Sequence, residues 1–339
     1  MEKRRRKILK LIGELSFLTI LTLLFIKVLD FEQLKNSLAI IKLSTVAIIL
    51  TFQLAIHAFG SLQWVIFLTQ GNIKRSFLKV LRARICGFSV SYITPSMYLG
   101  GEPIRANLLK EKDDRVTYNT LFATVTLDKY VELLTKFPTT VIGLSFMIFF
   151  FNPQPMLIII SLILIVTITG FFLFLLFKLF YDDSFINKFF RALIKPFFRI
   201  RPRTAVKVLF AVREFEKEVH TIIHDKRYFY LAAGIGTLVG VLEVLQTYYI
   251  LTLFGIKNLI DAFIIFGGTI LSAIFTLIPA NLGGMEGVNL LLFSLLGIGI
   301  ENGLTYTIII RIGQLSFVAL GLVMLFLNRL LKQNPFRRI

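Results

Sequence analysis

The chain has 339 residues, of which 56% are hydrophobic and 17% are charged, and its mean hydropathy is +0.77. Long apolar runs separated by short charged segments are typical of an all-α polytopic integral membrane protein and exclude a soluble domain. The net charge of +18 does not indicate a nucleic-acid partner, because the Lys and Arg residues lie between the apolar runs, where they orient a membrane protein. A single cysteine, Cys86, excludes an internal disulfide, and three histidines are too few for a His-rich metal centre.

Six apolar segments are long enough to cross a bilayer, which requires about 20 residues per helix. In chain order they cover residues 11–29, 46–69, 116–151, 156–181, 228–254 and 303–328. The first follows the basic sequence MEKRRRK and so begins like a signal peptide, but no small-residue cleavage site follows it, and we expect an uncleaved span. The third is too long for one straight span, and we expect Pro138 to bend it.

Two further apolar segments, 77–110 and 259–299, are interrupted by proline and glycine. Lys and Arg residues place the N-terminus, the loop after the second span, the loop 182–227 and the C-terminal tail on the cytoplasmic side of the cell membrane. The basic residues of the loop after the second span are Lys74, Arg75, Lys79, Arg82 and Arg84. With four segments on one side, each interrupted segment must return to the side from which it entered, so we expect two re-entrant hairpins from opposite faces.

The breaks in these two segments resemble each other. The first reads PSMYLGGE and ends at Glu102, and the second reads PANLGGME and ends at Glu286. A cation follows each break at a similar distance, since Lys129 comes 27 residues after Glu102 and Arg311 comes 25 residues after Glu286. A matched pair of broken helices with opposite orientations predicts an inverted repeat with a binding site near the membrane midplane. Chance similarity between two Pro/Gly breaks is the alternative.

The predicted organisation is one transmembrane domain over residues 1–339, with a first repeat at about 46–151 and a second at about 228–328. Between the repeats, the loop 182–227 contains FINKFFRALIKPFFRI, in which apolar residues recur at helical spacing with Lys and Arg between them. This pattern is typical of an amphipathic helix that lies on an anionic leaflet. A basic loop of this kind also serves simply as the positive-inside signal.

The glycine pairs of the two breaks form the first part of a candidate site. They are Gly100-Gly101 and Gly283-Gly284. Without a Cβ the backbone can turn there, and the free N–H groups of the helix that follows can point at a phosphate. Alternatively, the glycines only permit close helix packing. The carboxylate after each pair can cap the helix start, pair with the cation that follows, or carry a proton.

Four charges lie within the apolar sequence TLFATVTLDKYVELLTKFP, namely Asp128, Lys129, Glu132 and Lys136. Asp128 and Glu132 share a helix face at i,i+4, and Lys129 reaches Glu132 at i,i+3. Charges within a span are costly and usually face a cavity or one another. They therefore indicate either a polar binding site or a structural cluster whose members satisfy one another.

Arg311 is the isolated charge of the last span. Its surroundings, TIIIRIGQL, offer no acid on the same helix, so the partner of this guanidinium must come from elsewhere. Glu102, Glu286, Glu243 or a lipid phosphate could serve. We expect Arg311 to act in a functional site.

Several stretches resemble the membrane domain of lysylphosphatidylglycerol synthase/flippase proteins over nearly the whole chain. They read GFSVSYITPSMYLGGEPIRANLLKEK, ATVTLDKYVELL, IPANLGGMEG and IIIRIGQLSF, and the first contains the motif T-P-x4-GGEP-x-R from Thr94 to Arg105. In the family the helix after this motif commonly carries an arginine after an acid, whereas Asp128-Lys129 keeps the cation and loses its bidentate fork. The resemblance implies the lipid-translocating half of these proteins. Because the chain stops about ten residues past its last predicted span, we expect no cytoplasmic aminoacyltransferase domain.

The leading prediction is a lipid translocase that moves a phospholipid or polyprenyl-linked head group across the cytoplasmic membrane, with both termini cytoplasmic. The predicted head-group site comprises Thr94, Gly100, Gly101, Glu102, Arg105, Asp128, Lys129, Glu132, Gly283, Gly284, Glu286 and Arg311. No GxSxG, HExxH or P-loop sequence occurs, so we expect no enzymatic activity, metal or cofactor. The alternatives are an integral-membrane enzyme with Glu102 or Asp128 as general base, and an accessory partner of a separate glycosyl- or aminoacyltransferase. The expected partners are membrane lipids, either anionic phospholipids or lipid-linked glycans, and a homodimer stays open.

Overall fold

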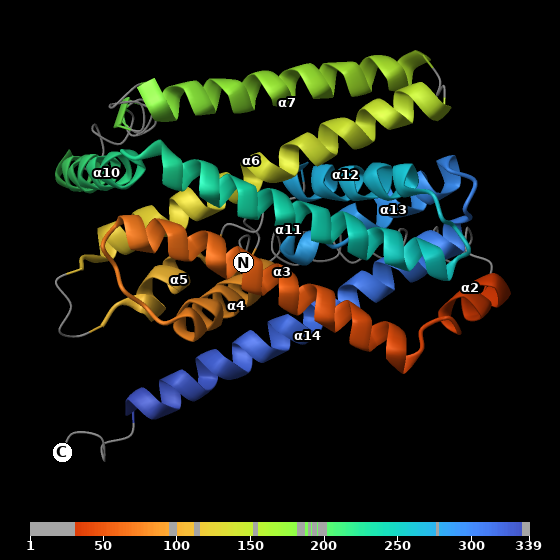
Figure 1. Cartoon of the computed structure of the whole chain (residues 1–339), viewed down its shortest axis with the longest axis horizontal. Helices are drawn as coiled ribbons and strands as arrows, with labels where there is room; N and C mark the ends of the chain where they lie inside the picture. The colour runs from red at the N-terminus through yellow and green to blue at the C-terminus, as the bar shows by residue number, and fades with distance from the viewer. Residues whose placement is uncertain are drawn as a thin grey trace, which may run out of the picture.

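The computed structural model describes residues 31–94, 100–111, 116–151, 155–181, 187–188, 191, 195, 202–275 and 278–333. Within these ranges every regular element is a helix (Figure 1). The predicted span 11–29, the first part of the break in segment 77–110, and almost all of the FINKFFRALIKPFFRI sequence lie outside the described residues.

The helices are bounded as follows: α2 Phe31–Leu38, α3 Leu43–Gln70, α4 Phe77–Ile93, α5 Glu102–Leu109, α6 Tyr118–Phe151, α7 Pro155–Tyr181, α10 Pro202–Ile223, α11 Lys226–Leu253, α12 Leu259–Phe275, the 3₁₀ turn η1 Pro279–Asn281, α13 Gly284–Leu295 and α14 Ile300–Gln333. Apolar, helix-compatible sequence without internal proline accounts for most of these lengths, because such runs can propagate helical hydrogen bonds without interruption. At the start of α11, the carboxylate of Asp225 accepts a hydrogen bond from the backbone N–H of Arg227 and caps the helix.

Four helices are long and apolar enough to cross a membrane, which agrees with an α-helical membrane protein. They are Leu43–Gln70, Tyr118–Phe150, Lys226–Leu253 and Ile300–Asn328. They coincide with four of the six predicted spans. The predicted span 156–181 falls on α7, whose apolar stretch Ile158–Phe171 is shorter than these four. Helix α6 runs through Pro138 as one helix of 34 residues.

Both interrupted segments fold as a helix, a break and a shorter helix. Segment 77–110 consists of α4 and α5, and segment 259–299 consists of α12, η1 and α13. The flanking helices match in length, with 28 residues in α3 and in α11, 17 in α4 and in α12, and 34 in α6 and in α14. The packing is reciprocal: α4 packs against α14, α12 packs against α6, and α3 packs against α11.

Polar groups lie inside the bundle and large apolar groups lie outside it. Asp128 has no exposed surface, whereas Leu43, Leu78 and Phe149 are at least 74% exposed. This distribution suits a molecule whose surroundings are hydrocarbon, because exposed apolar side chains then face lipid tails.

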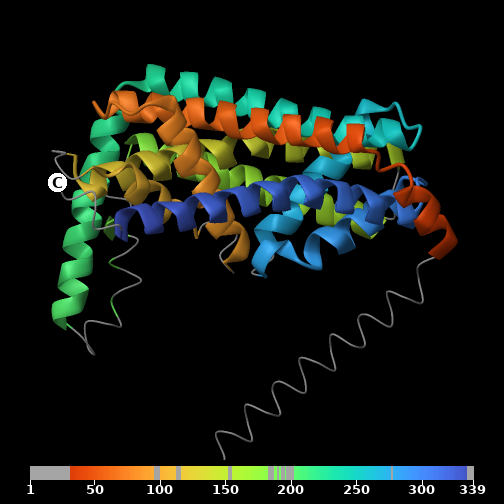
Figure 2. The ribbon, with the colours of Figure 1, turned by 90° about the horizontal axis from the view of Figure 1, so that it is seen from below.

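Helix α10 differs in direction from the long helices. It is seen nearly end-on at one end of the bundle in Figure 1 and along its length in Figure 2. Its inner side, with Val219 and Ile222 buried, packs against α6 and α3. The outer side carries Phe210, Arg213 and Lys217, so α10 lies across one end of the bundle with a mixed apolar and basic surface.

Candidate functional site

A network of buried ion pairs lies where α4, α5, α6 and α11 meet. We call it the charged cluster; its members are Arg84, Arg105, Asp128, Lys129, Glu132, Lys136 and Glu243. The long apolar helices bring these residues together, because each helix buries its few charged positions against the others.

Asp128 is the centre of the charged cluster. Its carboxylate accepts hydrogen bonds from Arg84 Nη1 at 2.9 Å, from Arg105 Nη2, and from Gln63 Nε2 at 2.9 Å. Gln63 also donates to the backbone carbonyl of Asp128 at 2.9 Å. One side chain of α6 therefore holds α3, α4 and α5 together, with its charge offset by two guanidinium groups.

Glu132 extends the cluster by one helical turn. It accepts hydrogen bonds from Arg84 Nη2 and Lys129 Nζ, each at 3.1 Å, and Lys136 Nζ lies 3.6 Å away. The contact with Lys129 is the i,i+3 pair that the spacing predicts. Lys136 then donates to Glu243 Oε1 of α11 at 2.8 Å. The cluster thus joins segments on both sides of the basic loop.

Helix α5 begins at Glu102 with Pro103 in its first turn, as the sequence predicts. Glu102 is 8% exposed, and its Oε2 has no hydrogen-bond partner among the described residues. Arg105, one turn later, stacks its guanidinium over the Trp64 ring at 4.2 Å, and its buried Nε likewise has no partner in the described part of the chain. An acceptor and a donor therefore remain unused on one face of α5.

Gly101 allows α5 to approach α4 closely. A Cβ at Gly101 would overlap the carbonyl oxygen of Gly87, while the N–H of Gly101 donates to Ser91 Oγ at 2.8 Å. This N–H is therefore engaged within the protein, and close packing, the alternative that the sequence offered, accounts for the glycine. Gly100 precedes it in the turn, and Thr94 ends α4 by donating to the Val90 carbonyl at 2.9 Å.

A second network, the Arg311 cluster, forms around the other break and comprises Arg311, Glu286, Tyr92 and the carbonyl groups of Ala280 and Asn281. Arg311 Nε donates to Glu286 Oε1 at 2.8 Å, and Nη2 lies 2.6 Å from the same oxygen. Nη1 donates to Tyr92 OH at 2.7 Å and to the Ala280 carbonyl at 2.8 Å, and Nη2 reaches the Asn281 carbonyl at 3.4 Å. The guanidinium thus donates four hydrogen bonds and forms a close ion pair with Glu286, so each of its three nitrogens is engaged.

The backbone of this break is unusual in conformation. Ala280 and Asn281 have φ of 57° and 52°, and Gly283 has φ of 81°, all in the left-handed region. Two successive non-glycine residues there are strained, and hydrogen bonds from Arg311 to their carbonyls hold them. Glu286 also accepts from the N–H of Gly283 at 2.9 Å, so it both pairs with Arg311 and caps α13, which starts at Gly284.

Lys129 and Arg311 occupy matching places, since each comes eleven residues after the start of its 34-residue helix. Their environments differ. Every guanidinium nitrogen of Arg311 is engaged, whereas the ammonium of Lys129 has three N–H groups and makes, among the described residues, one hydrogen bond, to Glu132. The side chain of Lys129 is 16% exposed. Of the two cations, Lys129 has the donors to spare for a ligand.

Several members of both networks are missing from the sequence-based site. They are Gln63, Arg84, Tyr92, Lys136 and Glu243. Arg84 was expected in the cytoplasmic loop, which is wrong: it lies inside α4, its side chain is 11% exposed, and it also donates to the Gly60 carbonyl at 2.9 Å. The apolar sequence ICGF directly after it is the signal for a buried position. Within the described residues no group of three His, Cys, Asp or Glu side chains could hold a metal ion.

The family model described as "Lysylphosphatidylglycerol synthase TM region" matches residues 11–321. A UPF0104 membrane protein of Methanothermobacter thermautotrophicus is 26% identical over 273 residues, covering 78% of this chain and 79% of that protein. A UPF0104 membrane protein of Pyrococcus horikoshii is 23% identical over 279 residues, covering 79% and 82%. No solved structure matches the chain.

Proposed function

We propose a function from one premise: this chain belongs to the lysylphosphatidylglycerol synthase transmembrane-region family. It is a multi-pass membrane protein, and the function we propose is translocation of a lipid head group. The observation that carries the proposal is a buried charged cluster, with unused hydrogen-bonding atoms, where the first helix–break–helix hairpin meets α6 and α11. Charged groups within membrane spans usually pair with one another or face a cavity, and they mark the paths of substrates and ions.

The proposed architecture is an inverted repeat. The two units are α3–α6 and α11–α14, and three of their four helices match in length. The reciprocal contacts of α4 with α14 and of α12 with α6 support an exchange of hairpins between the units. Each hairpin would be re-entrant, with its break near the midplane, as the basic segments of the sequence require. Six spans in all would leave both termini in the cytoplasm.

The proposed route for the head group passes the open side of the charged cluster. Lys129 would bind the phosphate, because its ammonium has N–H groups beyond the one used by Glu132. Glu102 would accept a hydrogen bond from a hydroxyl or amine of the head group through its unused Oε2. Arg311 would have a structural role, because its guanidinium donates hydrogen bonds to Glu286 and to the backbone of the second break. We therefore do not assign it to the phosphate, although the sequence places it in the head-group site.

The substrates we propose are anionic phospholipids or lipid-linked glycans of the cytoplasmic membrane, moved without a nucleotide cofactor. A separate glycosyl- or aminoacyltransferase could supply or consume such a lipid. These partners, and a homodimer, stay predictions.

The test is head-group movement by the purified chain in liposomes that contain fluorescent phosphatidylglycerol. We expect the wild-type protein to make labelled lipid of the inner leaflet accessible to a membrane-impermeant quencher. Lys129→Gln should slow this movement about tenfold or more, the equivalent of one charged hydrogen bond of about 1.4 kcal/mol. Lys129→Arg should keep most of it, and Lys257→Gln, at an exposed site outside the cluster, is the matched control. Undiminished movement with Lys129→Gln would refute the residue assignment, and no movement by wild type would refute the function.

An integral-membrane enzyme is the second candidate, and the unpaired buried oxygen of Glu102 favours it, since a general base needs a free lone pair. Asp128 does not suit that role, because its carboxylate already accepts three donors. Incubation with radiolabelled membrane lipids distinguishes the two functions. A chemically new product that disappears with Glu102→Gln would support the enzyme; recovery of unchanged lipid supports translocation.

A further inference from the structure

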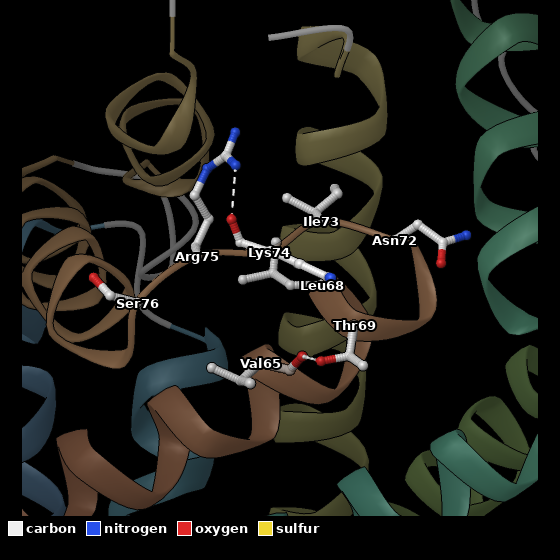
Figure 3. Close-up of a pocket in the computed structure, with 8 residues that line it drawn as sticks. All are labelled: Val65, Leu68, Thr69, Asn72, Ile73, Lys74, Arg75 and Ser76. Carbon is white, nitrogen blue, oxygen red and sulfur yellow. Dashed lines mark hydrogen bonds between the residues drawn. The ribbon is translucent and has the colours of Figure 1, made fainter.

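A cavity of about 540 Å³ opens at the end of α3, where the chain turns into α4. Figure 3 shows the residues around it. Val65, Leu68 and Ile73 supply apolar lining, and Thr69, Asn72, Lys74 and Ser76 supply polar groups. None of these residues belongs to the charged cluster or the Arg311 cluster, so the cavity is a separate feature of the molecule.

Lys74 is the cation that this cavity offers to a ligand. It is exposed, and it forms no ion pair within the described part of the chain. Its neighbour Arg75 turns away from it in Figure 3 and is occupied: Nε donates to the Leu109 carbonyl at 2.9 Å and Nη1 to the Lys74 carbonyl at 2.8 Å. The ammonium of Lys74 is thus free to meet an anion.

Glu111 lies beside this turn and pairs with other cations. Glu111 accepts a hydrogen bond from Lys79 Nζ at 2.8 Å, and Arg75 Nε lies 3.9 Å from the same oxygen. The Lys79 hydrogen bond and these two positive charges hold the pKa of Glu111 below its ordinary value. Glu111 therefore stays ionised and engaged with Lys79 and Arg75, and it forms no ion pair with Lys74.

The wall of the cavity is preformed. Asn72 adopts the left-handed conformation at φ of 55°, and the N–H of Ile73 donates to the Leu68 carbonyl at 2.8 Å. Arg75 ties the same turn to the last residue of α5. A ligand that binds here loses little affinity to the conformational entropy of ordering the loop, because the hydrogen bonds that shape the loop are already present.

Apolar side chains continue the surface beside the cavity. Phe77 and Leu78, in the first turn of α4, are 37% and 74% exposed. The site also lies at the end of a helix long enough to cross the bilayer, Leu43–Gln70, and hence at the level where head groups meet acyl chains. A ligand that suits this surface has an anionic group and hydrocarbon next to each other.

We propose that this cavity binds the head group of an anionic phospholipid from the adjacent leaflet. Lys74 pairs with the phosphate, Ser76 and Asn72 donate hydrogen bonds to it, and the acyl chains lie along Phe77 and Leu78. The site is separate from the translocation route and does not depend on translocation. Since Arg75 links its wall to α5, occupancy also stabilises the position of the helix that carries Glu102.

The experiment uses the full chain in neutral detergent, with Thr69→Cys, at an exposed lining position, as the single accessible thiol in a Cys86→Ser background. The rate of maleimide labelling at position 69 is measured against added phosphatidylglycerol, phosphatidylcholine or inorganic phosphate. We expect phosphatidylglycerol to slow labelling in a saturable way and the other two to have little effect. Adding Lys74→Ala should weaken the apparent affinity about fivefold, the equivalent of about 1 kcal/mol for one basic residue near anionic lipid. Lys257→Ala, at another exposed site, should leave it unchanged.

Three results would overturn the proposal. Equal protection by phosphatidylcholine means that any lipid shields the site. Protection by inorganic phosphate alone means a site for a soluble anion. Absence of protection, or an apparent affinity that Lys74→Ala leaves unchanged, means that Lys74 does not recognise a lipid phosphate. Liposome translocation by the Lys74→Ala variant, measured in parallel, separates this site from the proposed function.

Discussion

At Asp128 and Arg311 the chain surrounds a charge with several protein partners. The carboxylate of Asp128 accepts hydrogen bonds from three side chains, and the guanidinium of Arg311 donates four hydrogen bonds. A buried charge with every partner present costs little, whereas loss of one partner leaves the other charges exposed to a low-dielectric medium. These two residues are therefore structural, and Lys129 and Glu102 are the residues with capacity left for a ligand.

Asp128→Asn should destabilise the protein strongly, because the substitution removes the charge that offsets Arg84 and Arg105. We expect a loss of about 3–5 kcal/mol, the usual cost of breaking a buried ion pair on one side. Thermal unfolding in detergent measures it. Glu111→Gln is the control, since Glu111 is half exposed and its 2.8 Å pair with the exposed Lys79 is screened by solvent, so its loss should change the melting temperature very little. Equal effects of the two substitutions would contradict a structural role for the charged cluster.

Arg311→Lys should loosen the second break although it keeps the positive charge. Lysine has three donors on one atom and cannot reach the Glu286 carboxylate, Tyr92 and both carbonyls together, so we expect a loss of about 2–4 kcal/mol. Tyr92→Phe removes one acceptor and should cost about 1–2 kcal/mol. Limited proteolysis and thermal unfolding report both changes. Wild-type stability of Arg311→Lys would show that charge alone, and not the fork geometry, holds the break.

At the scale of the helices, four of the six predicted spans coincide with helices long enough to cross a membrane, and the sequence does not predict how the helices pair. Helices α3, α11 and α14 begin and end within a few residues of their predicted spans, because continuous apolar sequence of that length has one stable form in a bilayer. Lys136 contacts Glu243, which lies 107 residues away in the chain, and no local sequence pattern predicts this contact. For Arg311 the sequence leaves three acids open, and only packing selects Glu286.

Arg84 shows that a count of basic residues does not place every cation correctly relative to the membrane. It lies seven residues after the start of α4, close in sequence to the basic residues of the preceding loop, and the count therefore assigns it to the cytoplasmic side. The structure instead buries it against Gly60, where a Cβ would collide with its guanidinium. Whether a cation near a helix end faces solvent or protein depends on the neighbouring helix, which the sequence of one segment does not contain.

Gly101→Ala should separate α5 from α4, because the added Cβ overlaps the backbone of Gly87 and neither backbone can yield cheaply. We expect a loss of about 3 kcal/mol or more from this overpacking. Gly287→Ala is the matched control in the other hairpin: nothing lies within 4 Å of its Cβ, and alanine in α13 should stabilise the helix by up to about 1 kcal/mol. Thermal unfolding of both variants gives the comparison. A harmless Gly101→Ala would mean that the two helices are not in close contact.

At the scale of the whole molecule, the reciprocal packing of two similar units fits one inverted repeat better than two independent bundles. Helix α4 contributes Arg84 to the charged cluster and Tyr92 to the Arg311 cluster. The two residues are eight positions apart, which is about 12 Å along a helix axis. One helix thus contributes a side chain to each polar network. A displacement of α4 would therefore change the contacts of both networks.

The inverted repeat predicts opposite orientations for the hairpins α4–α5 and α12–α13, and this prediction can be tested directly. If the two hairpins enter the membrane from opposite faces, the end of α5 lies in the cytoplasm while both ends of segment 259–299 lie outside the cell. Single cysteines at the exposed positions Lys110, Lys257 and Ser294, in a Cys86→Ser background, can be probed with an impermeant thiol reagent on intact cells. We expect Lys257→Cys and Ser294→Cys to label on intact cells and Lys110→Cys to label only after lysis, because basic segments flank the first hairpin and hold it inside. Labelling of Lys110→Cys from outside would make α4–α5 an ordinary kinked span. Labelling of Ser294→Cys only after lysis would make α12–α13 a crossing, and the matched breaks would then lie on the same side.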